Sequence, residues 1–438
     1  MAGSAQPAAV HWRLWLAQAG VFAGLALLLL ITLIGAASPG AGLPCFYAAI
    51  VNYNARNLSA DGGAWAQREL GARHPALFLE TPTTAAFSAY TAVVLLAVAA
   101  FDVAAAIIIR RENSGGFAAA YHMNALATLA TPPGALLLGA LAAWTLQAAV
   151  LLLSHKIMVL AAATYLAHLA PPAAFVGLFC TAGLPGAEYA QAVHALRERS
   201  PRAHRLLGPG RAVMINLAGG LLALIIGTAP LMLGQLLGAG LGLSLAQTVV
   251  AGVTVLCLAA VLFLVLTELV LSRYTQVLPG PAFGTLVAAS CIAVASHDYF
   301  HQLRGVVRTQ APRAAARVKL ALAGVALLAV AMLVLRLVRA CLHHRRKGSA
   351  FYGHVSAARQ QAARYIARAR SSRGMAPLEG DAAALLDRGV ASDDEEAVYE
   401  ADAPPRPPTI PLRRPEVPHS RASHPRPPPR SPPPAHVK

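Results

Sequence analysis

The stretch LAQTVVAGVTVLCLAAVLFLVLTELVL forms residues Leu245–Leu271 and contains no charged side chain before Glu268. A helix needs about 20 consecutive apolar residues to cross the hydrocarbon core of a bilayer. The stretch meets this requirement, so it predicts a transmembrane helix.

Seven more apolar runs surround this stretch. The weakest is short and carries Ser290, Cys291 and Ser296. Two others are separated only by Ser154-His155-Lys156, which predicts a tight helical hairpin. We therefore predict an all-α, polytopic membrane protein with eight transmembrane helices within residues 14–341. The other predicted spans are Leu14–Ala37, Ala85–Ile109, Gly134–Leu153, Ile157–Cys180, Ala212–Leu236, Pro281–Ser296 and Lys319–Cys341.

The composition supports a membrane protein. Of the 438 residues, 56% are hydrophobic and 13% are charged, and the mean hydropathy is +0.54. Ordinary soluble domains have about 25% charged residues, so soluble enzymes, disordered proteins and fibrous proteins are excluded. The net charge of +17 is concentrated in a C-terminal tail and between the apolar runs. We expect membrane lipids and acidic proteins as its counter-charges, and no nucleic acid.

The predicted topology places both termini in the cytosol. The one N-glycosylation motif, Asn57-Leu58-Ser59, lies in the long loop 38–84, which suggests that this loop is lumenal or extracellular. Basic residues are almost evenly divided between the two sides. Those at the tail side of the last span decide the orientation, because cytosolic segments are enriched in Lys and Arg; they are Arg339, Arg345, Arg346 and Lys347. The basic loop Phe300–Arg317 is an exception to this rule.

The first span is longer than the 7–15 residues of a signal-peptide core, but the small residues Gly35-Ala36-Ala37 leave cleavage open. Cleavage would leave a seven-span protein, which is the pattern of a receptor. Such a receptor would be expected to carry a D-R-Y and an N-P-x-x-Y motif, and the sequence has neither.

Cys45 is the single cysteine of the predicted lumenal loops. In an oxidising compartment such a cysteine tends to pair, which favours an intermolecular disulfide over a free or buried thiol. Cys341 adjoins a basic membrane edge and fits S-palmitoylation. The sequence contains no signature of a catalytic site, a metal site or a cofactor.

Two acidic residues, Asp102 and Glu268, lie inside predicted spans. They indicate either a proton or ion relay, as in a transporter or channel, or a polar contact between helices. Pro171-Pro172 predicts a kink in the fourth span rather than a transporter's broken helix. The stretch Phe117–Pro133 is interpreted as a loop or interfacial segment.

Small residues recur at helical spacing in the first span and around the link between the fifth and sixth spans. They predict close packing within the bundle, with a docking groove for a single-span partner as the alternative. These residues are Gly20 and Gly24, and Gly234, Gly238 and Gly242.

The tail, residues 342–438, is predicted to be cytosolic, and it is successively basic, acidic and proline-rich. Phe351–Arg373 has the pattern of a basic amphipathic helix, or else forms a solvated coil. Pro404–Lys438 is predicted to be disordered. Four short motifs fit sorting signals or an SH3 ligand. They are Tyr352 with Val355, Asp381 with Leu385 and Leu386, the acidic cluster of Asp393, Asp394, Glu395 and Glu396, and Arg426 with Pro429 and Pro432.

This layout resembles the herpesvirus glycoprotein M family, and the Ala/Arg/Pro-rich composition resembles its alphaherpesvirus members. The sharpest matches are Leu43-Pro44-Cys45-Phe46-Tyr47 and Asn57-Leu58-Ser59. The resemblance implies that Cys45 bonds to glycoprotein N, a small single-span partner, and that Asn57 is glycosylated. It further implies a non-enzymatic virion envelope protein that acts in secondary envelopment, in trafficking of other envelope proteins to trans-Golgi membranes, and in damping membrane fusion.

The same resemblance implies clathrin adaptors and tegument proteins as further partners. The expected locations are the virion envelope and the Golgi, trans-Golgi and endosomal membranes of the host, with plasma and nuclear membranes as additional sites.

Overall fold

The computed structural model describes residues 12–38, 74–112, 126–155, 157–181, 200–274, 277–303, 307 and 311–346. All of them belong to one compact unit, Met1–Val355; the second unit is Ser356–Lys438. Within the described ranges every regular element is a helix. The elements are α1 (Trp12–Ala37), α3 (Thr81–Glu112), α5 (Pro133–Ser154), α6 (Met158–His168), α7 (Ala170–Thr181), α9 (Pro201–Arg205), η2 (Leu206–Gly210), α10 (Arg211–Leu241), α11 (Leu245–Leu269), η3 (Leu271–Arg273), α12 (Gly280–Gln302) and α14 (Ala314–Arg346).

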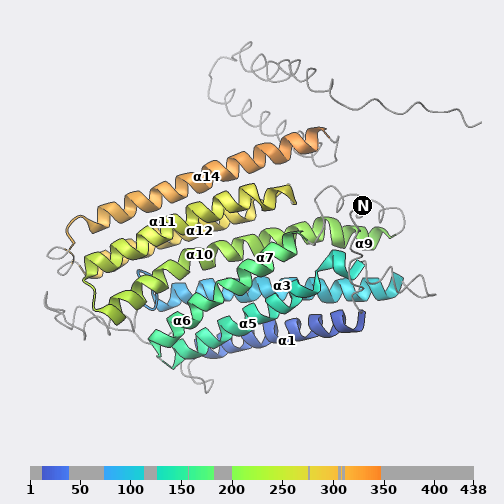
Figure 1. Cartoon of the computed structure of the whole chain (residues 1–438), viewed down its shortest axis with the longest axis horizontal. Helices are drawn as coiled ribbons and strands as arrows, with labels where there is room; N and C mark the ends of the chain where they lie inside the picture. The colour runs from blue at the N-terminus through green and yellow to red at the C-terminus, as the bar shows by residue number, and fades with distance from the viewer. Residues whose placement is uncertain are drawn as a thin grey trace, which may run out of the picture. The chain divides into compact units, whose positions relative to one another are not determined.

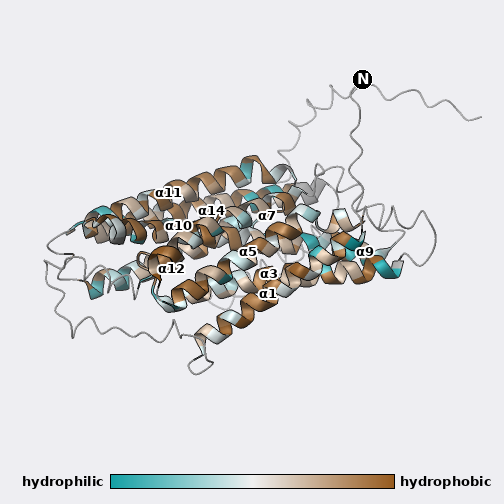
Figure 2. Ribbon diagram, turned by 60° about the horizontal axis from the view of Figure 1, so that its bottom comes forward, coloured by the Kyte–Doolittle hydropathy of each residue, from teal (hydrophilic) through white to brown (hydrophobic). Residues whose placement is uncertain are grey.

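Eight of the helical stretches in the described ranges are long and apolar enough to cross a membrane, which confirms the predicted all-α, polytopic fold. Apolar residues dominate the length of these helices, whereas hydrophilic residues gather near their ends (Figure 2). Many large side chains on the outer faces are exposed, for example Leu258, Leu320 and Leu327. Such faces are suited to lipid rather than to water.

α10 is the central helix of the bundle. It packs against α3, α6 and α7 on one side and against α11 and α12 on the other. α1 packs against α3 and α5, and α14 packs against α11 and α12 (Figure 1). The residues of α10 are correspondingly the most buried of the eight candidate spans.

Several predicted boundaries are shifted in the structure. The seventh span is not short: α12 continues to Gln302, because its serines donate to carbonyl groups of the preceding turn and add no unpaired polar group. Ser290 Oγ lies 2.8 Å from Leu286 O, and Ser296 Oγ lies 2.8 Å from Ala293 O. α3 begins at Thr81 rather than at Ala85.

The interpretation of Phe117–Pro133 as a loop or interfacial segment is wrong for its final part. Residues 126–130 are helical, and Leu126, Ala127 and Ala130 are buried in the core. Apolar side chains there gain more from packing in the bundle than from the interface. The earlier residues 113–125 lie outside the described ranges.

The tight hairpin between the third and fourth spans is confirmed, with Ile157 N donating to Leu152 O at 3.0 Å. The fourth span, for which a kink is predicted, is interrupted at a single residue. α6 and α7 are separated only by Leu169, whose φ of −60° and ψ of −36° are helical. Ala173 N still donates to Leu169 O, so no turn of backbone is unwound.

Glycines allow two pairs of helices to approach closely. A Cβ atom on Gly284 of α12 would lie 2.8 Å from the Gly220 backbone of α10, and one on Gly234 would lie 3.1 Å from Gly252 Cα of α11. The packing role predicted for Gly234 and Gly238 is therefore confirmed. For Gly20 and Gly24 of α1 it is wrong, because a Cβ atom on either would meet nothing within 4 Å. It is also wrong for Gly242, which meets nothing within 4 Å and instead ends α10 with a φ of +62°.

Candidate functional site

The last residues of the loop between α1 and α3 enter the bundle. Leu77 N donates to Leu231 O of α10 at 3.0 Å, and the ring of Phe78 packs edge-on against Tyr299 of α12. His74 packs against the same tyrosine, and its side chain is buried. The turn requires a φ of +69° at Phe78, which is uncommon for a bulky residue. The C-terminal end of the loop that contains Cys45 is thus fixed to the bundle.

A buried polar cluster joins four helical segments where α10 begins. Thr131 Oγ1 donates to Asp102 Oδ1 at 2.5 Å, and Trp15 Nε1 donates to Thr131 O at 2.8 Å. Arg211, the first residue of α10, donates to Ala130 O at 3.2 Å and also to Phe179 O. The cluster links α1, α3, α7 and α10 through the segment 126–132.

Arg211 is the cation of this cluster. Its guanidinium carbon lies 5.2 Å from the centre of the Phe179 ring, and its charge acts on Asp102. The Asp102 side chain is fully buried and has no contact with solvent. A buried carboxylate that is hydrogen-bonded through one oxygen in this way holds neighbouring helices together.

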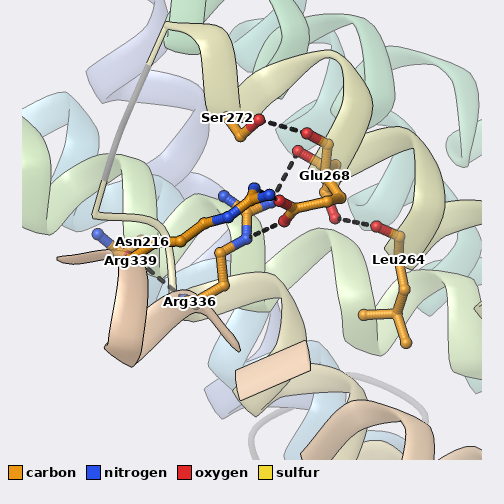
Figure 3. A network of polar contacts seen from close by, with 8 residues as sticks. Asn216, Leu264, Glu268, Ser272, Arg336 and Arg339 are labelled. Carbon is orange, nitrogen blue, oxygen red and sulfur yellow. Dashed lines mark hydrogen bonds and ion pairs between the residues drawn. The ribbon is translucent and has the colours of Figure 1, made fainter. Parts of the chain in front are cut away.

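A second cluster connects α11 with α14. Arg336 Nε lies 2.6 Å from Glu268 Oε2, and Arg339 Nη1 contacts the other carboxylate oxygen of Glu268 (Figure 3). Arg336 Nη2 also donates to Thr267 O at 2.8 Å. Because residues three apart share a helix face, both arginines reach the same carboxylate.

This second cluster has an excess of one positive charge, from two guanidinium groups and one carboxylate. Arg336 is only 4% exposed and Glu268 is 14% exposed, whereas Arg339 is 57% exposed. The carboxylate is already neutralised by two cations, so it is not available to bind a transported cation. Of the two roles predicted for Asp102 and Glu268, the structure favours polar contacts between helices.

Arg336 and Arg211 were not predicted from the sequence as members of these clusters. Arg336 lies inside an apolar run that still qualifies as a span, so its charge did not interrupt the pattern. The useful signal was a basic residue within one predicted span and an acidic residue near the same end of another, since charges inside a membrane are rarely left unpaired.

Of the residues predicted to be modified, to form the disulfide or to act in sorting, Cys341 is the one within the described ranges. It is partly buried and lies near the end of α14, close to the edge of the last candidate span. The other predicted site residues lie outside the described ranges: Cys45, Asn57, Tyr352, Val355, Asp381, Leu385, Leu386, Asp393, Asp394, Glu395, Glu396, Arg426, Pro429 and Pro432.

The family model for herpesvirus glycoprotein M matches residues 8–355 of this chain. The chain is 99% identical over its whole length to all of the envelope glycoprotein M of bovine herpesvirus 1.1 (strain Cooper). It is 40% identical to that of suid herpesvirus 1, over 91% of this chain and 99% of the relative. It is 37% identical to that of equine herpesvirus 1 (strain Ab4p), over 89% and 88%.

No solved structure matches the chain. The extent of the family match covers all eight candidate spans and every described residue. Because the family model matches most of the chain and the relatives align over nearly their entire lengths, the chain belongs to the herpesvirus glycoprotein M family.

Proposed function

We propose that this protein is a non-enzymatic glycoprotein of the virion envelope that holds a small single-span partner, glycoprotein N, through a disulfide at Cys45. The observation that carries this proposal is the family match over residues 8–355, which includes Cys45 and Asn57. The aligned relatives are named envelope glycoproteins. The eight-span bundle supplies the membrane scaffold that this role requires.

The position of Cys45 restricts where such a partner can cross the membrane. Cys45 follows Ser38, at the end of α1, by only seven residues. A chain spans at most about 3.6 Å per residue, so Cys45 lies within about 25 Å of that end of α1. The exposed small-residue face of Gly20 and Gly24 is on the same helix, and small residues allow a second helix to approach closely. This face is our proposed contact for the partner's span.

We further propose that the protein acts in secondary envelopment, in returning envelope proteins to trans-Golgi and endosomal membranes, and in damping membrane fusion. In this proposal the cytosolic tail recruits clathrin adaptors and tegument proteins. The sequence motifs at Tyr352, at Leu385 and Leu386, and in the acidic cluster Asp393–Glu396 support this role of the tail.

The disulfide is tested by replacing Cys45 with serine in the full-length protein expressed with glycoprotein N. Non-reducing gels should show a higher-mass species for the wild type and none for Cys45→Ser. Cys341→Ser is the matched control and should keep the higher-mass species, because the predicted topology places Cys341 on the opposite side of the membrane from Cys45. A higher-mass species that persists in Cys45→Ser would count against the proposed bond.

A transporter or channel is not favoured by the two acidic residues that suggested it. Asp102 is sealed from solvent by its neighbours, and Glu268 is paired with two arginines. Neither carboxylate offers the wet, vacant site on which ion transport depends.

A further inference from the structure

A groove of about 500 Å³ lies between the first turns of α11 and α14. Its walls are formed largely by Val249, Val250 and Val253 of α11 and by Ala321 of α14. These side chains are apolar and mostly small, so the two helices leave a space between them. The volume is within the range of small-molecule sites, which is about 300–1,000 Å³.

Two arginines flank one end of this groove. Arg313 directly precedes α14, and Arg317 lies in its first turn. Their spacing of four residues places both guanidinium groups on the same side of the helix. Both side chains are exposed, and neither has a hydrogen bond or ion pair with another described residue. The groove therefore has a cationic mouth and an apolar body.

The groove opens toward the outer surface of the bundle. Val250, in its wall, is 57% exposed, and Leu320, which precedes the lining residue Ala321 in the sequence of α14, is 76% exposed. α14 as a whole is the least buried of the candidate spans. In a bilayer this surface faces lipid, so lipid molecules have direct access to the groove.

The charges at the groove favour a lipid over a protein helix as its occupant. From Arg313 to Ala321 the groove extends over eight residues, or about 12 Å along the helix axis. An apolar helix would cover the valines but leave the two arginines without a counter-charge. An anionic lipid has a phosphate for the arginines and an acyl chain for the valines.

We propose that this groove binds one anionic phospholipid. Its phosphate would pair with Arg313 and Arg317, and an acyl chain would lie along the valines of α11. The binding would also explain the basic segment Phe300–Arg317, which runs against the positive-inside rule in the predicted topology. In that topology the bound lipid belongs to the lumenal leaflet.

The test uses the full-length protein, purified in detergent, stripped of lipid, and mixed with equal amounts of phosphatidylserine and phosphatidylcholine that carry identical chains. Native mass spectrometry then reports which lipid remains bound. We expect the wild type to retain phosphatidylserine preferentially. The double variant Arg313→Gln/Arg317→Gln should bind it about thirtyfold more weakly, since two basic residues that each contribute about 1 kcal/mol near an anionic headgroup together correspond to that factor.

The matched control is Arg110→Gln/Arg111→Gln, which removes the same charge from the last turn of α3, away from the groove. It should retain phosphatidylserine as the wild type does. Equal retention of both lipids by the wild type, or an equal loss in the control, would overturn the proposal. The midpoint of thermal unfolding is measured for each variant, to check that the variant is folded.

Two further arms separate a lipid in the groove from simple attraction between charges. Ala321→Phe fills the groove and leaves both arginines, so it should also weaken phosphatidylserine binding. Glycerophosphoserine has the same headgroup without chains, and it should not displace the lipid. Unchanged binding by Ala321→Phe, or efficient displacement by glycerophosphoserine, would show that the apolar groove makes no contribution and would refute the proposal.

Discussion

Arg336 of α14 and Glu268 of α11 form an ion pair, with Nε and Oε2 2.6 Å apart (Figure 3). α14 is otherwise the least buried of the candidate spans, so this pair is a major polar attachment of α14 to the bundle. Its geometry is reinforced by Arg339 and by the bond from Arg336 to Thr267 O.

Replacing Arg336 with methionine should destabilise the bundle, because Glu268 loses its buried partner. Breaking a buried pair in this way costs about 3 kcal/mol. The double variant Glu268→Gln/Arg336→Met, which removes both charges, should recover much of that loss. Thermal unfolding in detergent measures both effects, with Arg339→Gln as a control that should cost less because Arg339 is mostly exposed. A double variant less stable than the single one would contradict the pairing.

Thr131→Val should weaken the cluster at the start of α10. The substitution keeps the shape of the side chain but removes the donor to Asp102 Oδ1. An unsatisfied buried acceptor costs about 1–3 kcal/mol. Thr181→Val is the matched control, since its hydroxyl only donates to Leu178 O of its own helix. Equal thermal midpoints for the two variants would argue against a structural role of the Thr131–Asp102 contact.

Gly284→Ala should destabilise the contact between α10 and α12. The added Cβ atom would lie 2.8 Å from the backbone of Gly220, so one helix must move. Overpacking of this kind costs about 1–3 kcal/mol. The same substitution at Gly24 meets nothing within 4 Å and should leave the stability of the bundle unchanged or raise it. The unfolding temperatures of the two variants are compared. A lower unfolding temperature for Gly24→Ala than for Gly284→Ala would contradict this prediction.

Deleting Tyr352–Lys438 should move the protein from trans-Golgi membranes to the cell surface, because the proposed sorting motifs all lie in this segment. Surface biotinylation and imaging of the infected cell measure the shift. A variant with Tyr352→Ala alone should shift partially if the other motifs contribute. Unchanged trans-Golgi residence of the truncated protein would refute the sorting role of the tail.

The positions of the spans could be predicted from the sequence, but the contacts between them could not. A long apolar run is sufficient to identify a helix such as α11, whose boundaries agree with the prediction to within two residues at its end. The sides that face protein and lipid are equally apolar: Leu256 is 3% exposed and Leu258 is 66% exposed on the same helix. Composition therefore carries little information about which helices meet.

The polar contacts were harder to predict for a related reason. Asp102 could be identified as unusual, but its partners, Thr131 and Arg211, are far away in the chain and belong to segments read as a loop and as a span boundary. The buried segment around Leu77 is too short to give a periodic signal. Such contacts are determined by the tertiary arrangement and have no local pattern.

The central claim is that the chain crosses the membrane eight times with both ends in the cytosol. The most direct measurement is protease protection of intact microsomes that contain the protein with one epitope tag at each terminus and Asn57 intact. We predict that both tags are digested from outside the vesicles and that Asn57 carries a glycan sensitive to endoglycosidase. Protection of one tag and digestion of the other would place the termini on opposite faces and contradict the account.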